Sequence, residues 1–322
     1  MSTPSSALTS DSNHSSSAQN AATPNPATSN AFQLFPLRVL QEKKERRESI
    51  AMISLYDAPS AVIACEAGAD VLLVGDSLGN VILGYENTIP VSMQDMVRHT
   101  GAVVRGARQS KRPTVPVVAD LPFGSYAGSR QAIARNAVAL MQAGAHAVKL
   151  EGANQSTLRA IQIIQDMGAP VVGHIGFTPQ SVLNFSRVVQ GRSVQAARDL
   201  WDAAFALQAA GCCAIVMEAV PSEVAQKVSS EIEIPIIGIG AGGGCDGQVL
   251  VWHDLIGLSP QSLRFSKAFA QARQILQQAA AEYVSHVHSR DFPQVQHGWN
   301  LSDDERTAWD EMAAKLERPD PA

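Results

Sequence analysis

The sequence has few of the features that mark membrane, secreted or nucleic-acid-binding proteins. Its 322 residues include only four cysteines, none with CxxC spacing, which is not typical of a disulfide framework or a cysteine-rich zinc site. No apolar stretch approaches the roughly 20 residues that span a bilayer. Charged residues make up 17% of the chain, the formal net charge is -5, and no long basic run is present. Neither nucleic acid nor an anionic membrane is therefore expected as a partner.

The two ends of the chain differ in composition from its centre. Residues 1–30 are almost entirely Ser, Thr, Ala, Asn, Pro and Gln, with no Lys or Arg, so they resemble neither a signal peptide nor a basic transit peptide. Such a segment buries too little apolar surface to offset the entropy of ordering it, which predicts a disordered tail. Residues 38–48 predict a charged surface helix. Residues 291–322 predict a polar C-terminal extension, either loose or with a short helix near 303–316 capped by Ser302 or Asp303.

Short apolar runs rich in Val and Ile alternate with helical patterns through the centre of the chain, residues 31–290. Continuous apolarity of this kind is typical of strands that are buried on both faces. Helical periodicity is clearest over residues 129–143 and 194–210, and Gly68, Gly144 and Gly211 suit left-handed helix ends. Seven such units and a weaker eighth strand predict a single (βα)8 TIM barrel with an N-terminal helix. The expected strands are 52–55, 71–74, 115–118, 147–150, 171–173, 214–217, 236–239 and 248–252.

Charged residues follow several of these strands, at the end where barrel enzymes hold their active sites. Each has an ordinary structural explanation, because an Asp after a strand often caps the next helix and a His is often a hydrogen-bonded core residue. Four carboxylates that converge without a cation, however, repel one another and resist ionisation. The pattern therefore predicts a bound divalent ion, and oxygen ligands favour Mg²⁺ or a similar hard ion over zinc. The residues are Asp76, Asp120, Lys149, Glu151, His174 and Glu218.

Three further features have alternative interpretations. Lys149 and Glu151 alternate on one strand and share a face, either as a buried ion pair or as part of an anion-binding site. The glycine-rich stretch 238–244 is consistent with a phosphate-binding loop, or with close approach of the backbone to another group. His253 and Asp254, near the eighth strand, are either catalytic or structural.

Seven short stretches, in one order over roughly residues 38–290, resemble the ketopantoate hydroxymethyltransferase family. They are Leu55-Tyr56-Asp57, Val74-Gly75-Asp76-Ser77-Leu78-Gly79-Asn80, Ala119-Asp120-Leu121-Pro122-Phe123, Val148-Lys149-Leu150-Glu151-Gly152, Gly173-His174-Ile175-Gly176-Phe177-Thr178-Pro179-Gln180-Ser181, Met217-Glu218-Ala219-Val220-Pro221 and Ile237-Gly238-Ile239-Gly240-Ala241-Gly242.

The resemblance implies a specific reaction and a role for each residue. The family transfers a hydroxymethyl group from methylenetetrahydrofolate to 3-methyl-2-oxobutanoate through an enolate that Mg²⁺ stabilises, and the product is ketopantoate, on the path to pantothenate and coenzyme A. The resemblance also implies a large homo-oligomer, a decamer, and the few, unpaired-looking cysteines predict a cytoplasmic protein with reduced thiols. By resemblance, the metal residues are Asp76, Asp120 and Glu151, the substrate-binding residues are Asp76, Ser77, Asp120, Lys149 and His174, and the catalytic proton acceptor is Glu218.

Two other functions are consistent with parts of the pattern. A carbon–carbon lyase of the isocitrate lyase and phosphoenolpyruvate mutase type shares Tyr56-Asp57 and the Ala-Gly-Ala-Asp sequence before the second strand, but the sequence lacks the Lys-x-x-Cys-Gly loop of those lyases. A non-catalytic scaffold is expected to have lost at least one charge at the strand ends, and none is missing.

Overall fold

Eight parallel strands pair in sequence order and close into a barrel, because β8 also pairs with β1. The computed structural model describes residues 37–259 and 264–316, so the tail predicted over 1–30 lies outside the described residues. The predicted (βα)8 barrel is confirmed, including its weak eighth strand. The strands are β1 (Ile50–Ser54), β2 (Val71–Val74), β3 (Val117–Asp120), β4 (Ala147–Glu151), β5 (Val171–Gly176), β6 (Ala214–Glu218), β7 (Ile236–Ile239) and β8 (Gly247–Val251).

Alternation along each strand separates the barrel interior from the helix-covered surface. In β4, Ala147 belongs to the apolar cluster inside the barrel, whereas Val148 and Leu150 belong to the cluster that packs under the surrounding helices. Lys149 and Glu151 therefore share the inner face with Ala147, as a period of two requires. Apolar side chains fill the N-terminal half of the barrel interior. The charged residues at the C-terminal ends of the strands therefore pack on this apolar layer.

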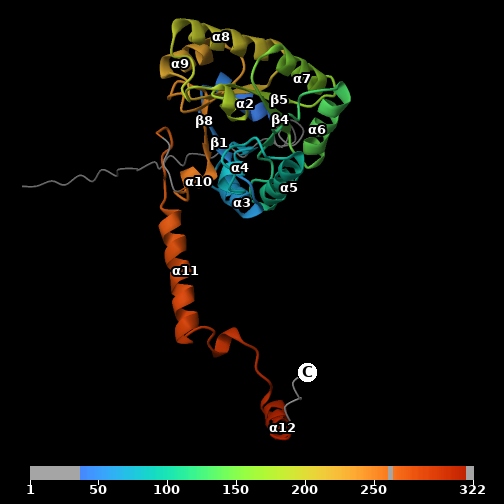
Figure 1. Cartoon of the computed structure of the whole chain (residues 1–322), viewed down its shortest axis with the longest axis vertical. Helices are drawn as coiled ribbons and strands as arrows, with labels where there is room; N and C mark the ends of the chain where they lie inside the picture. Colours follow the sequence, from blue (N-terminus) through green and yellow to red (C-terminus); the bar gives the residue numbers. More distant parts are fainter. Residues whose placement is uncertain (1–36, 260–263, 317–322) are drawn as a thin grey trace, which may run out of the picture.

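Helices surround the barrel in the order of the chain (Figure 1). Side-chain oxygens of Ser129 and Ser193 accept the first hydrogen bonds of the two helices predicted most clearly, α6 and α8. The glycines at 68, 144 and 211 have positive φ, as predicted for left-handed helix ends. The helices around the barrel are α3 (Ala58–Glu66), α4 (Leu78–Val81), α5 (Met93–Gln109), α6 (Arg130–Gln142), α7 (Gln155–Gln165), α8 (Val194–Ala209) and α9 (Ser222–Glu231), with the short η1 (Pro179–Asn184) after β5.

One expected unit lacks its helix. Residues 240–246 alone join β7 to β8, although a parallel crossover usually needs about a dozen residues or more. The glycines of this segment allow it to pass close to α9, since a Cβ on Gly242 would clash with Ser222 and one on Gly244 would lie 2.6 Å from Gln226 Cβ. The close approach that the glycines permit is therefore to the chain itself, which favours the backbone-approach interpretation over the phosphate loop.

The N-terminal helix α2 (Arg38–Glu45) closes the N-terminal end of the barrel. Leu40 is 1% exposed and belongs to the interior cluster, so the helix is less of a surface element than its charges predict. Lys44 Nζ donates to Asp246 Oδ2 at 2.7 Å, and the same oxygen accepts from Ser229 Oγ at 2.9 Å and from the Ile236 backbone N–H at 2.8 Å. Asp246 thus joins α2, α9 and β7 far from the C-terminal ends of the strands.

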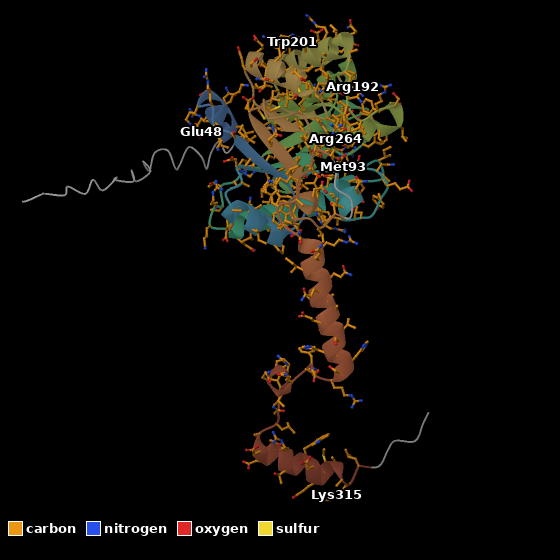
Figure 2. The ribbon with its side chains drawn as sticks, turned by 90° about the vertical axis from the view of Figure 1, so that its left-hand side faces the viewer. Glu48, Met93, Arg192, Trp201, Arg264 and Lys315 are labelled. Carbon is orange, nitrogen blue, oxygen red and sulfur yellow. The ribbon has the colours of Figure 1, made fainter. Side chains whose placement is uncertain are left out.

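The C-terminal helices extend away from the barrel. α11 (Ala272–Ser289) projects from it in both views, and α12 (Asp303–Ala313), capped by Ser302 as predicted, lies beyond α11 (Figures 1 and 2). The short α10 (Trp252–Leu255) precedes α11, and η2 (Val295–His297) follows it. The outer faces of β1 and β8, which the last helix of a closed barrel ordinarily covers, border a hollow of about 1340 Å³. No described helix is long and apolar enough to cross a membrane.

Candidate active site

All the predicted site residues line one cavity at the C-terminal ends of the strands. Its volume is about 610 Å³, and its wall includes residues from β2 to β6 and the loops that follow them. The sequence therefore predicted a set of residues, far apart in the chain, that the barrel brings together. They are Asp76, Ser77, Asp120, Lys149, Glu151, His174 and Glu218.

Asp76 and Asp120 are two neighbouring buried carboxylates in the cavity. Both are at most 3% exposed, and the Asp76 backbone N–H donates to Asp120 Oδ2 at 3.1 Å. Burial, followed by the negative charges of Asp120 and Glu151, holds the pKa of Asp76 well above its usual range. Burial also raises the pKa of Asp120, although Lys149 opposes that effect. Two buried carboxylates that resist ionisation are a favourable place for a cation.

Lys149 pairs with Asp120 rather than with its strand neighbour Glu151. The Lys149 ammonium lies 2.9 Å from Asp120 Oδ1, and both side chains are 3% exposed. Burial alone disfavours the ammonium, but the carboxylates of Asp120, Glu151 and Asp76 outweigh that effect and raise the pKa of Lys149. The group is therefore a permanent positive charge in the wall of the cavity.

His174 lies between two glutamates in the upper barrel. Its Nδ1 is 3.3 Å from Glu151 Oε1 and its Nε2 is 3.5 Å from Glu218 Oε2. Burial and Lys149 disfavour the imidazolium, but the adjacent carboxylates of Glu151 and Glu218 raise the pKa of His174 to about 9. Burial opposes ionisation of Glu151 in turn, yet the hydrogen bond from His174 brings its pKa below the usual value. Glu218, with a side chain 16% exposed, is the more accessible glutamate.

Several polar residues that contact the site residues were not predicted to have a role. Tyr56 and Gln180 stand in the quoted motifs, and Tyr126 lies outside them. Gln180 is 3% exposed and hydrogen-bonds both Asp76 and Glu151. Tyr126 donates to Gln180 Oε1 at 2.7 Å, and Tyr56 is hydrogen-bonded to Ser77 at 2.7 Å between the two hydroxyl oxygens. Gln180 follows β5 between Pro179 and Ser181, and apart from its place in the quoted motif the sequence carries no local signal of its role. Asp254, but not His253, belongs to the wall of the cavity among the described residues.

The donors of the cavity fit a hard divalent cation. When all are ionised, the six carboxylates of the wall (Asp76, Glu86, Asp120, Glu151, Glu218 and Asp254) exceed the two cations, Lys149 and His174, by a net charge of -4. In the described part of the chain, no three His, Cys, Asp or Glu side chains are arranged to bind one metal ion together. Mg²⁺ does not require three, because one or two carboxylates often hold it while substrate oxygens and water complete the octahedron. Asp76 and Asp120 suit that arrangement, with both oxygens of Asp120 also in contact with Lys149 and the Asp76 N–H. Both oxygens of Glu151 are likewise held, by His174 and Gln180.

Comparison with known sequences identifies the family. A sequence model described as ketopantoate hydroxymethyltransferase matches residues 35–295. The chain belongs to this family. A curated 3-methyl-2-oxobutanoate hydroxymethyltransferase of Listeria monocytogenes is 48% identical over 265 residues, which cover 81% of this chain and 94% of the relative. One from Carboxydothermus hydrogenoformans is 47% identical over 266 residues, covering 82% of this chain and 94% of the relative. The family resemblance seen in the seven stretches is thus confirmed.

Solved structures of other proteins share the fold at much lower identity. Phosphoenolpyruvate phosphomutase from Streptomyces platensis subsp. rosaceus aligns with a TM-score of 0.55 at 13% identity, covering 86% of this chain and 95% of that protein. 2,3-Dimethylmalate lyase, a member of the PEP mutase/isocitrate lyase superfamily, aligns with a TM-score of 0.51 at 17% identity, covering 86% and 98%. These likenesses show the barrel architecture alone, so they relate the lyase alternative to this chain only by fold.

Proposed function

We propose that the chain transfers a hydroxymethyl group from methylenetetrahydrofolate to 3-methyl-2-oxobutanoate, giving 2-dehydropantoate (ketopantoate) for pantothenate and coenzyme A biosynthesis. The observation that carries the proposal is the convergence of Asp76, Asp120, Lys149, His174 and Glu218 on one cavity, in a member of the hydroxymethyltransferase family. A keto acid needs cationic groups for its carboxylate and a base for its branched carbon, and the cavity contains both.

Residue roles follow from the positions in the cavity. Asp76 and Asp120, with Glu151 close behind them, would hold Mg²⁺, which when bound polarises a carbonyl oxygen as a Lewis acid. Glu218, the more accessible of the two glutamates, accepts the proton from the branched carbon. Lys149 and protonated His174 hold the negative charge that develops on the substrate oxygens, and they do so without reorganisation because both are buried and fixed. Ser77, oriented by the Tyr56 hydroxyl, hydrogen-bonds the keto acid.

Proton exchange tests the first half-reaction separately from transfer. We would follow the proton on the branched carbon of 3-methyl-2-oxobutanoate by NMR in D₂O, with Mg²⁺ and without folate. Exchange is expected with wild-type protein and is expected to stop with EDTA. In Glu218→Gln, loss of the base is expected to slow exchange about 10²–10⁴-fold.

The second half-reaction supplies the deciding control. Adding methylenetetrahydrofolate is expected to give ketopantoate with wild-type protein only in the presence of Mg²⁺. A folded, Mg²⁺-loaded protein that neither exchanges the proton nor forms ketopantoate would contradict the proposed reaction. Exchange that persists unchanged in Glu218→Gln would contradict only the role of Glu218.

We also propose that the enzyme is a cytoplasmic homo-oligomer, a decamer as the family resemblance implies. The free thiols of all four cysteines, every one within the described ranges, support a reducing location. Support for assembly comes from α11, on which no residue is buried and one face is apolar. A solvent-exposed apolar face of this size is typical of an interface. Its residues include Ile275, Leu276, Tyr283, Val284 and Val287, which are 40–64% exposed.

A further inference from the structure

Gln180 makes hydrogen bonds to the ends of three different strands. Its backbone N–H donates to Glu151 Oε2 at 3.0 Å, and its side-chain Nε2 donates to Asp76 Oδ2 at 2.8 Å. The same Nε2 donates to the Leu121 carbonyl at 2.9 Å. Asp76 follows β2, Leu121 follows β3, and Glu151 ends β4, so one residue after β5 fixes three neighbouring strand ends relative to one another.

The partners determine which way the Gln180 amide faces. Both hydrogens of Nε2 are used, while Oε1 accepts from the Tyr126 hydroxyl at 2.7 Å. If the amide were reversed, its oxygen would face the Asp76 carboxylate and the Leu121 carbonyl, which are both acceptors. Burial, followed by the charge of Glu151, raises the pKa of Tyr126, so its hydroxyl remains a donor throughout the neutral range.

A neutral donor suits a site that must leave its carboxylates negative. Lys149 already provides a full positive charge to Asp120. The Gln180 side-chain amide instead orients Asp76, and the Gln180 backbone N–H orients Glu151, without neutralising either carboxylate, so their charge remains for a cation. Neither Gln180 nor Tyr126 belongs to the cavity wall among the described residues, so both lie behind the carboxylates rather than against a substrate.

We propose that Gln180 is a positioning residue that holds the Asp76 and Glu151 carboxylates in the geometry that binds the divalent cation, and that Tyr126 fixes the orientation of its amide. The inference rests on the metal site proposed above. Outer partners of metal ligands commonly affect metal affinity by restricting ligand orientation, and their loss typically weakens binding about 10–100-fold.

Direct metal binding tests the inference without reference to catalysis. Full-length protein freed of metal with EDTA and dialysed would be titrated with Mn²⁺, with free Mn²⁺ measured by electron paramagnetic resonance. Gln180→Leu, which keeps the volume but removes the side-chain donors, is expected to raise the Mn²⁺ Kd about 10–100-fold. Tyr126→Phe, which leaves Gln180 intact but frees its amide to rotate, is expected to give a smaller rise. Asp76→Asn should weaken binding at least as much as Gln180→Leu.

Gln208→Leu is the matched control, because the Gln208 side chain is likewise hydrogen-bonded to the backbone, accepting from the Glu233 and Ile234 N–H groups, but lies at the opposite end of the barrel. It should leave the Mn²⁺ Kd unchanged. An unchanged Kd in folded Gln180→Leu would overturn the inference. If circular dichroism shows that Gln180→Leu does not fold, an unchanged Kd in Tyr126→Phe overturns it instead. Wild-type protein that binds no Mn²⁺ would refute the metal site itself, which separates failure of the site from failure of Gln180 alone.

Discussion

At the scale of single residues, Asp76 is a buried carboxylate with two other carboxylates, Asp120 and Glu151, close by. Its raised pKa means that the ionised form is unfavourable in the fold, because of burial and then of the neighbouring Asp120 and Glu151 charges. A group of this kind is expected at an active site, where electrostatic strain is retained because the chemistry needs it.

Asp76→Asn is therefore expected to stabilise the metal-free enzyme. The amide removes the unfavourable charge and still accepts the hydrogen bond from Gln180. In EDTA at neutral pH, the thermal unfolding midpoint should rise by about 2–4 °C, which corresponds to about 1 kcal/mol for a chain of this size. Added Mg²⁺ should raise the midpoint of wild-type protein but not that of the variant.

Asp95→Asn is a control of opposite sign. Asp95 completes the capping box of α5 with Ser92, whose hydrogen bond lowers the pKa of Asp95, so loss of its charge should lower the midpoint. If Asp76→Asn lowers the metal-free midpoint as Asp95→Asn does, Asp76 is not electrostatically strained.

His174 should make stability depend on pH in the alkaline range. Its folded pKa, about 9, lies above the ordinary value of 6.5, so protonated His174 stabilises the fold. That contribution is fully present below pH 6.5 and is lost as the pH rises through 9, with a total of about 3 kcal/mol at most. Urea unfolding in EDTA should show wild-type stability falling across this window and a flatter profile in His174→Gln.

Other histidines do not obscure that window. Burial lowers the pKa of His146 and of His253, so their contributions change below pH 6.5 and with the opposite sign. His146→Gln is therefore a suitable control, since it should leave the alkaline slope intact. Equal slopes in wild-type protein and His174→Gln would contradict the assignment.

At the scale of elements, no helix lies between β7 and β8, and the Asp246 side chain in this short loop connects the neighbouring elements by hydrogen bonds. Its carboxylate joins α2, α9 and β7 through Lys44, Ser229 and Ile236. Asp246→Ala removes an acceptor from three partly buried donors, so the free energy of unfolding should fall by about 2–3 kcal/mol. Urea denaturation followed by circular dichroism measures this loss.

The exposed ion pair of Lys227 with Glu231 on α9 is the comparison. Glu231→Ala should change the free energy of unfolding by no more than about 0.5 kcal/mol, because exposed pairs one helical turn apart contribute little. Similar losses in the two variants would mean that Asp246 does not connect these elements as described.

At the scale of the whole molecule, the C-terminal helix α11 exposes apolar side chains. α11 leaves the barrel with its apolar face in solvent, and Lys315, near the end of the described chain, is far from the barrel (Figure 2). The hollow beside β1 and β8 is likewise apolar, with Ile53, Leu250, Phe265 and Phe269 in its wall. Both surfaces are of the kind that a second copy of the chain covers on assembly.

Charges on the apolar face of α11 should disrupt that assembly. Wild-type protein is expected at a multiple of 34.2 kDa by light scattering after size exclusion. The double variant Leu276→Lys and Tyr283→Lys should shift to a smaller species, because it places two ammonium groups in the interface. Ser285→Lys, on the polar face of the same helix, should not. A monomeric wild-type protein would contradict the proposed oligomer.

The sequence by itself determined the strands and the candidate site. Apolar runs bounded by glycines are local signals, and the residue at the end of each run necessarily lies at the C-terminal end of a parallel barrel. For this reason Asp76, Asp120, Lys149, Glu151, His174 and Glu218 were all predicted, and all line the cavity. The helix boundaries of α6 and α8 were predictable because their serine caps are local as well.

Only the tertiary structure determined which residues of separate elements contact one another. The spacing puts Lys149 and Glu151 on one face of β4, but the register of β3 and β4 pairs Lys149 with Asp120, whose carboxylate the ammonium contacts. The glycines of 238–244 were consistent with a phosphate loop until α9 was found against them. Gln180 has no local pattern of its own, because its role depends on three strand ends that are distant in the chain. Such contacts depend on how separate elements are arranged, which local periodicity does not encode.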